Sequence, residues 1–171
     1  MTTPLEPLVV GVGSNLDPAR HVAAALDTLH QRALVVDTSA VYRSPAIGLP
    51  PGAPDFLNLA VRLQWEGTLF ELKALLEEIE AEQGRRREPG AWASRTLDLD
   101  ILTAGHLHGR VGAFTVPHPD IERFAHAAVP LAELAGEHIH PRLEVSYADL
   151  AGRLDASHLE RIDSLADGTV T

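Results

Sequence analysis

The order of the predicted elements favours an α+β fold in which a mainly antiparallel sheet is covered by helices. A strand, a helix and a strand are followed by a second strand, helix and strand within 171 residues. This order fits a split β-α-β plait. A doubly wound parallel sheet is the alternative, but it requires a helix between successive strands. The segment from Ser44 to Asp55 has too many prolines and glycines to supply one.

The first half of this pattern begins with the apolar run from Leu8 to Gly13, which is typical of a buried strand. Asp17-Pro18 then supplies an N-cap and a first-turn proline, and apolar residues at helical spacing predict a helix to about Gln31. The stretch from Ala33 to Tyr42 is rich in Val and Thr and favours a second strand. Ser44 to Asp55 is then a long loop. Such loops are usually lids or binding loops, and disorder is the alternative.

The second half begins with the clearest strand, Phe56 to Trp65, where apolar and polar residues alternate. Thr68 and Glu71 form a capping box that opens a helix, and Gly84 ends it. Arg85 to Ser94 contains a proline and a glycine and has no apolar period, so a second loop is expected there.

The remaining elements are weaker. Short strands are expected around His106 to Val111 and Phe114 to Val116, and Pro117-His118-Pro119-Asp120 caps a helix toward Ala135 that is interrupted at Pro130. The tail from Ser164 is expected to fray. No repeat or domain boundary is evident, so residues 1–171 are predicted to form a single domain.

Composition excludes several classes of protein. The net charge of -10 argues against a general binder of nucleic acid or anionic membranes. The absence of cysteine excludes disulfides, thiolate metal sites and cysteine nucleophiles, and fits a reducing compartment. No apolar run reaches the roughly 20 residues that a membrane span needs. We therefore expect a soluble cytoplasmic protein with no nucleic-acid or membrane partner.

An acidic strand is the most informative segment. It comprises Arg95-Thr96-Leu97-Asp98-Leu99-Asp100-Ile101-Leu102. Because alternate side chains of a strand share a face, Asp98 and Asp100 point to one side and the leucines and isoleucine between them to the other. Same-face neighbours lie roughly 6.5–7 Å apart at Cα, so both carboxylates can reach one hard cation or a bridged pair. The alternative is a solvated strand face.

Arginines surround the approach to this strand. Arg85 to Arg95 contains four arginines and one glutamate, although the protein as a whole is acidic. The planar guanidinium suits phosphate oxygens, which accept its paired donors. A solvated loop is the alternative, because arginine is common in a chain whose only lysine is Lys73. Acids that hold a metal beside arginines that hold phosphate indicate phosphoryl transfer.

Other motifs are less specific. Gly11-Val12-Gly13 lacks the third glycine of a dinucleotide fingerprint, so close packing is at least as good an explanation as ligand contact. Among nine histidines, the His-x-His pairs at 106/108 and 138/140 lack the companion ligands of a zinc site. His118, held between two prolines, can donate to a phosphate or ribose oxygen, or serve as a structural turn residue.

Taken together, these residues resemble the hydroxymethyl-dihydropterin pyrophosphokinase family of the folate pathway, whose members move pyrophosphate from ATP onto a pterin alcohol. The resemblance runs from Val9 to about Pro141. Its motifs are Gly13-Ser14-Asn15-Leu16, Tyr42-Arg43-Ser44-Pro45, Pro54-Asp55-Phe56-Leu57-Asn58, Gln83-Gly84-Arg85, Arg95-Thr96-Leu97-Asp98-Leu99-Asp100, Val116-Pro117-His118-Pro119 and Pro130-Leu131.

The resemblance implies a ferredoxin-like α+β fold, a monomer, ATP as co-substrate and two Mg²⁺ ions held by Asp98 and Asp100. In-line attack of the pterin alcohol on the β-phosphorus would release AMP. The implied catalytic residues are Arg85, Arg95, Asp98 and Asp100. The implied ATP-binding residues are Glu80, Arg85, Arg87, Trp92, Arg95, Ile101, Thr115 and His118, with the arginines on a mobile loop. The implied pterin-binding residues are Ser44, Pro45, Ile47, Phe56, Asn58, Asp98 and His126.

The chain departs from the family pattern before Pro130. The family usually has Arg-x-Phe there, and by ungapped spacing His126 takes the place of the aromatic and Phe124 that of the arginine. Either Phe124 shifts inward or the imidazole stacks on the pterin. Ala113 stands where an arginine is often found. Two other functions stay open, a pterin- or nucleotide-binding relative without turnover and a two-metal phosphohydrolase that uses water as acceptor.

Overall fold

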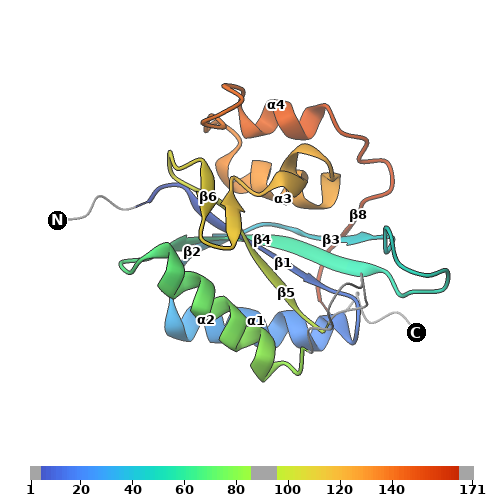
Figure 1. The fold of residues 1–171 in the computed structure, drawn as a ribbon. Helices are drawn as coiled ribbons and strands as arrows, with labels where there is room; N and C mark the ends of the chain where they lie inside the picture. The colour runs from blue at the N-terminus through green and yellow to red at the C-terminus, as the bar shows by residue number, and fades with distance from the viewer. Residues whose placement is uncertain (1–4, 86–95, 166–171) are drawn as a thin grey trace.

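The computed structural model describes residues 5–85 and 96–165. Its main sheet has the order β5-β1-β4-β3-β8, and β2 also pairs with β4 (Figure 1). The strands are β1 (Leu8–Ser14), β2 (Leu34–Thr38), β3 (Val41–Ser44), β4 (Phe56–Gln64), β5 (Asp98–Ala104), β6 (Gly109–Val111), β7 (Phe114–Val116) and β8 (Glu160–Ile162). The helices are α1 (Pro18–Arg32), α2 (Leu69–Glu82), the 3₁₀ helix η1 (Pro119–Glu122), α3 (Ala125–Ala135) and α4 (Tyr147–Gly152).

The topology is the split β-α-β plait that the sequence predicts. Strand β4 lies between β1 and β3 and is antiparallel to both. After β1 the chain therefore passes through α1 and returns to the sheet on the far side of β4. Strand β5 follows α2 and pairs antiparallel with the other edge of β1. The prediction of a ferredoxin-like α+β fold with a mainly antiparallel sheet is therefore confirmed.

Helices cover both faces of the sheet, as Figure 1 shows. The larger core lies between the sheet and helices α1 and α2, and it includes Leu97, Leu99 and Ile101. A second core lies under α3 and α4 and includes Leu102. Because side chains alternate along β5, Asp98 and Asp100 share the α3 side of the sheet with Leu102.

The sequence predicts the start of α2 fully and the start of α1 only in part. The capping box of α2 is confirmed, because Thr68 and Glu71 each bond the other's backbone N–H through their side chains. Helix α1 begins at Pro18 as predicted, but Asp17 does not cap it with its side chain. Its carboxylate instead lies 2.7 Å from Nε of Arg20.

The strand predicted from Ala33 to Tyr42 is wrong as a single element, because it is divided into β2 and β3. The division falls at Ser39, whose Oγ accepts the N–H of Ala60 at 2.8 Å. A side-chain oxygen thus takes the place of a backbone acceptor in the ladder. The register against β4 shifts by one residue between Thr38 and Tyr42 as a result.

The helix predicted to follow the cap Pro117-His118-Pro119-Asp120 toward Ala135, with an interruption at Pro130, is also divided, and not at Pro130. Phe124 is extended, with φ -127° and ψ 125°, so it separates η1 from α3. Pro130 is buried inside α3, which continues to Ala135. Packing of α3 on the sheet outweighs the one hydrogen bond that a proline removes. Within residues 5–85 and 96–165, no helix combines the length and apolar composition needed to cross a membrane.

We predict that Tyr147→Phe lowers the free energy of unfolding by about 1–2 kcal/mol, because it removes the only phenol that reaches the buried hydroxyl of Thr103 among the described residues. The two oxygens lie 2.7 Å apart, and both residues are buried. The double variant Tyr147→Phe/Thr103→Val should recover part of this loss, since no orphaned hydroxyl remains. Urea denaturation measures both. Equal stability of wild type and Tyr147→Phe would contradict the prediction.

Candidate active site

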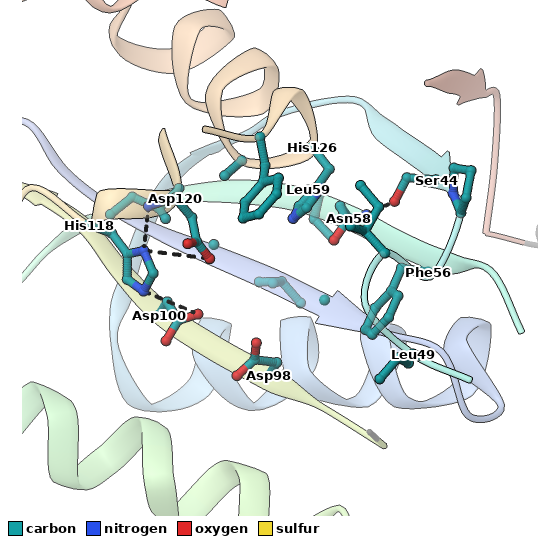
Figure 2. Close-up of a pocket in the computed structure, with 18 of the residues that line it drawn as sticks. Ser44, Leu49, Phe56, Asn58, Leu59, Asp98, Asp100, His118, Asp120 and His126 are labelled. Carbon is teal, nitrogen blue, oxygen red and sulfur yellow. Dashed lines mark hydrogen bonds and ion pairs between the residues drawn. The ribbon is translucent and has the colours of Figure 1, made fainter. Parts of the chain in front are cut away.

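A pocket of about 360 Å³ opens between the sheet and the start of α3. Figure 2 shows two groups of side chains along it: Asp98, Asp100, His118 and Asp120 at one end, and Ser44, Leu49, Phe56 and Asn58 at the other. The lining residues are Gly11, Val12, Gly13, Ser44, Pro45, Ile47, Leu49, Phe56, Asn58, Leu59, Arg85, Asp98, Asp100, Leu102, His118, Asp120, Phe124, His126 and Ala127.

Two glycines of the inner strand β1 make the floor of the pocket. In the strand register Gly13 lies between Asn58 of β4 and Asp98 of β5, and Gly11 lies between the next pair. A Cβ at Gly13 would stand 3.1 Å from Oδ1 of Asn58. The floor therefore stays open over two strand spacings, roughly 10 Å, between an amide and a carboxylate. The sequence alone left the role of these glycines undecided.

The acidic end is built on the edge strand β5. Asp98 Oδ1 lies 2.9 Å from Nη1 of Arg85, and Asp100 Oδ2 lies 3.8 Å from Nε2 of His118. Burial, followed by the charge of Asp98, raises the pKa of Asp100 to about 6. Two carboxylates crowded onto one strand face are an arrangement that a divalent cation stabilises.

The donor set at this end suits Mg²⁺. Carboxylate oxygens are its preferred protein ligands, and one or two of them usually suffice because water and substrate phosphates complete the shell. In the part of the chain that the structure describes, no three His, Cys, Asp or Glu side chains gather as a metal site. The residues present therefore fit a cation that is shared with a phosphate-bearing ligand.

His118 is held in one tautomer. Its backbone N–H donates to the carbonyl of Leu102 at 2.8 Å, which fixes it beside β5. Its Nδ1 accepts the backbone N–H of Asp120 at 3.1 Å. The proton of the neutral ring must then be on Nε2, the nitrogen that faces Asp100. Asp120 also lines the pocket, and sequence reasoning treated it only as part of a helix cap.

The opposite end of the pocket combines an amide with apolar walls. Asn58 Nδ2 donates to Oγ of Ser44 at 2.8 Å, and both residues are buried. Phe56, at the start of β4, and three residues of the preceding loop complete this end. The segment from Ser44 to Asp55, predicted to be a lid or binding loop, contributes Ser44, Pro45, Ile47 and Leu49 to the lining.

Phe124 and His126 both line the pocket, so the structure brings together the two residues that the sequence offered as alternatives. Their rings stack with centroids 5.2 Å apart and planes 14° apart. Burial lowers the pKa of His126, which favours the neutral imidazole. Its Nδ1 is buried without a hydrogen-bond partner among the described residues.

The candidate residues divide into three groups. The pocket brings together Arg85, Asp98, Asp100 and His118 with Ser44, Pro45, Ile47, Phe56, Asn58 and His126. Glu80 and Ile101 are each 2% exposed and, like Thr115, do not line it. Arg87, Trp92 and Arg95 lie outside the described residues.

Paired carboxylates beside an arginine, at one end of a pocket, are typical of phosphoryl-transfer enzymes. The family model described as 7,8-dihydro-6-hydroxymethylpterin-pyrophosphokinase matches residues 9–136. The chain belongs to this family.

Individual relatives agree with this assignment. The 2-amino-4-hydroxy-6-hydroxymethyldihydropteridine pyrophosphokinase of Haemophilus influenzae is 35% identical over 139 residues, which cover 80% of this chain and 86% of that one. Its counterpart in Bacillus subtilis is 37% identical over 128 residues, which cover 73% and 75%.

The fold is also that of solved structures. A crystal structure of Plasmodium falciparum HPPK-DHPS with pterin and p-hydroxybenzoate matches with a TM-score of 0.73 and 11% identity, over 94% of this chain and 47% of that one. The present chain thus spans about half the length of that protein, and the likeness concerns the fold alone.

We predict that Asp100→Asn stabilises the metal-free protein at neutral pH. Folding raises the pKa of Asp100 from 3.8 to about 6. The stability linked to this group is therefore present below the lower pKa and is lost as pH rises through the higher one. Because the side chain is 32% exposed, solvent screening limits the gain from Asp100→Asn to about 1 kcal/mol at pH 7.5.

Thermal unfolding in EDTA at pH 4 and pH 7.5 measures this effect. The melting temperature of Asp100→Asn should exceed that of wild type at pH 7.5 and approach it at pH 4. Asp27→Asn, which removes the same charge from an exposed position of α1, is the control. A lower melting temperature of Asp100→Asn than of wild type at pH 7.5 would contradict the raised pKa of Asp100.

Proposed function

We propose that this chain transfers pyrophosphate from ATP to the hydroxymethyl group of 6-hydroxymethyl-7,8-dihydropterin and releases AMP, a step of folate biosynthesis. Its family and its curated relatives bear the name of this enzyme. The observation that carries the proposal is the two-ended pocket. Asp98, Asp100 and Arg85 stand at the end suited to phosphate, and Ser44, Asn58 and Phe56 stand at the end suited to a flat heterocycle.

At the acidic end, Asp98 and Asp100 would hold two Mg²⁺ ions together with the phosphate oxygens of ATP. The ions would neutralise charge on the phosphates and on the attacking and leaving oxygens. His118 presents Nε2–H toward the same end, where it can donate to a phosphate oxygen. Arg85 supplies a guanidinium already seated beside Asp98. The other ATP contacts in this proposal are Arg87, Trp92, Arg95, Ile101 and Thr115, whereas buried Glu80, which does not line the pocket, would act through Arg85.

At the other end, the pterin would lie over the glycine floor. Asn58 would form hydrogen bonds with the polar edge of the pterin, since its amide offers both a donor and an acceptor. Phe56 would stack on one side of the ring, and neutral His126 with Phe124 on the other, while Ser44, Pro45 and Ile47 line the pocket. The open floor lets the hydroxymethyl group approach Asp98, where the β-phosphate would lie.

The reaction then depends on alignment. The pterin oxygen attacks the β-phosphorus in line with the departing AMP oxygen, and the residues around the pocket hold the two substrates in that geometry. Phosphoryl transfer requires little covalent chemistry from the protein, so positioning and electrostatic stabilisation carry the catalysis. We further propose that the protein is a monomer in the cytoplasm. The absence of cysteine is consistent with that reducing compartment.

We predict that AMP is released only when ATP, Mg²⁺ and the pterin alcohol are all present, and that EDTA abolishes the reaction. Asp98→Asn and Asp100→Asn should each lower kcat at least a hundredfold, because each removes a ligand that aligns the phosphates. Asp27→Asn serves as the charge-matched control. A coupled AMP assay measures all of these rates.

The same assay separates the rival functions. AMP release in the absence of pterin would indicate a phosphohydrolase that uses water. Binding of both substrates by calorimetry without AMP release would indicate a relative that does not turn over. Either result contradicts the proposed reaction.

We predict that Gly13→Val weakens pterin binding at least tenfold and leaves binding of a non-hydrolysable ATP analogue within about twofold. The new side chain would fill the floor beside Asn58, and a lost or blocked contact of about 1.4 kcal/mol corresponds to a factor of ten. Valine suits a strand, so the fold should persist. Gly11→Ala is the control on the same floor, because the three atoms nearest to its Cβ belong to Leu102 and not to Asn58. Unchanged pterin affinity of Gly13→Val, measured by calorimetry, would be inconsistent with this placement.

A further inference from the structure

Arg85 connects two carboxylates that belong to different elements. Its Nη1 contacts Oε2 of Glu80 on α2 and lies 2.9 Å from Oδ1 of Asp98 on β5. Its backbone N–H also donates to the carbonyl of Glu80 at 3.1 Å. Both ends of the residue are thus tied to Glu80, and the side chain is only 15% exposed. Gly84, with φ +79°, provides the left-handed turn that brings the chain back to this position.

Glu80 also supports the acidic strand directly. Its Oε2 accepts the backbone N–H of Leu99 at 3.1 Å. Leu99 stands between Asp98 and Asp100, and β5 is the last strand in the sheet order. The carboxylate therefore accepts a hydrogen bond at the edge where a neighbouring strand would otherwise do so. One buried acid fixes both the arginine and the backbone that presents the two aspartates.

Glu80 is buried outside the pocket, so its role must be indirect. With 2% of its surface exposed, it does not line the pocket. A buried carboxylate is stable only when it is paired and hydrogen-bonded, and Arg85 and Leu99 meet both needs here. Arg85 is bound both to buried Glu80 and to Asp98 in the pocket. It can therefore lose its contact with Asp98 and still be held by Glu80.

We infer that Arg85 is a placeholder for a divalent cation at Asp98, and that Glu80 is the positioning residue that retains it there. Without nucleotide the guanidinium compensates the charge of Asp98. When the cation arrives with ATP it takes that oxygen, and Arg85, still tethered to Glu80, turns to the phosphates. This inference rests on the proposed function, because it requires a cation at Asp98.

Two binding measurements test the inference without relying on turnover. In the first, Mn²⁺ alone is titrated against the protein and free Mn²⁺ is followed by electron paramagnetic resonance. Arg85→Met should bind Mn²⁺ about tenfold more tightly than wild type, because the competing charge is gone while an unbranched apolar side chain remains. Arg32→Met is the control. It removes an arginine that pairs with Glu78 and Glu82 away from the pocket, and should change nothing.

In the second, a double-mutant cycle is measured with a non-hydrolysable ATP analogue in Mg²⁺ by calorimetry. Glu80→Gln should weaken binding about tenfold in the wild-type background and less than about twofold in the Arg85→Met background. If the effect of Glu80→Gln disappears once Arg85 is removed, Glu80 acts through Arg85. A direct contact of Glu80 with the nucleotide would instead give the same factor in both backgrounds.

Each outcome decides the matter. Equal or weaker Mn²⁺ binding by Arg85→Met, or an additive cycle, overturns the inference. If Arg85→Met does not fold, Glu80→Gln is compared with Glu80→Gln/Arg85→Met, which removes both members of the buried ion pair. The double variant should still bind Mn²⁺ more tightly than Glu80→Gln. A wild-type protein that binds neither Mn²⁺ nor the ATP analogue defeats the proposed function itself. If the wild type binds both, equal or weaker Mn²⁺ binding by Arg85→Met defeats the placeholder role of Arg85, and an additive cycle defeats the positioning role of Glu80.

Discussion

Asp98 and Asp100 stand on one face of an edge strand whose other face is buried in the core, and their mutual repulsion is the constraint around which the pocket is organised. Leu97, Leu99 and Ile101 hold β5 in place through the larger core. The two carboxylates cannot turn away without withdrawing those side chains from it. Charge of opposite sign must therefore be supplied from outside the strand. Arg85 supplies part of it in the structure, and a divalent cation would supply more.

The sheet sets the distance between this acidic end and the amide of Asn58. Register places one strand, β1, between β4 and β5, and β1 carries glycine at the two positions that face the pocket. The absence of side chains there creates the cavity, and the start of α3 covers it with Phe124 and His126. The space in the pocket is thus set by the backbone of β1 more than by any single side chain.

Much of this arrangement follows from local patterns in the sequence. Alternation fixes which side of β5 bears the acids, the capping box fixes the start of α2, and the density of proline and glycine after Ser44 indicates a loop that lines the pocket. These features depend on residues close together in the chain. The contribution of Arg85 to the pocket was also indicated, because it begins the arginine-rich segment that precedes the acidic strand.

What the sequence could not predict depends on contacts between distant segments. Ser39 divides a strand because its hydroxyl meets Ala60, and only the sheet register reveals that Gly13 lies between Asn58 and Asp98. Asp120 was missed since a helix-cap motif explained it fully. Helix α4 and strand β8 are too short to give a periodic signal.

The central claim is that the carboxylate pair on β5 holds divalent cations against a polyphosphate. The most direct test is a crystal grown with Mn²⁺ and a non-hydrolysable ATP analogue, with diffraction recorded at a wavelength where manganese scatters anomalously. We expect two anomalous peaks, each within coordination distance of Asp98 or Asp100 and of a phosphate oxygen. A nucleotide seated in the pocket with no peak at either aspartate would contradict the account.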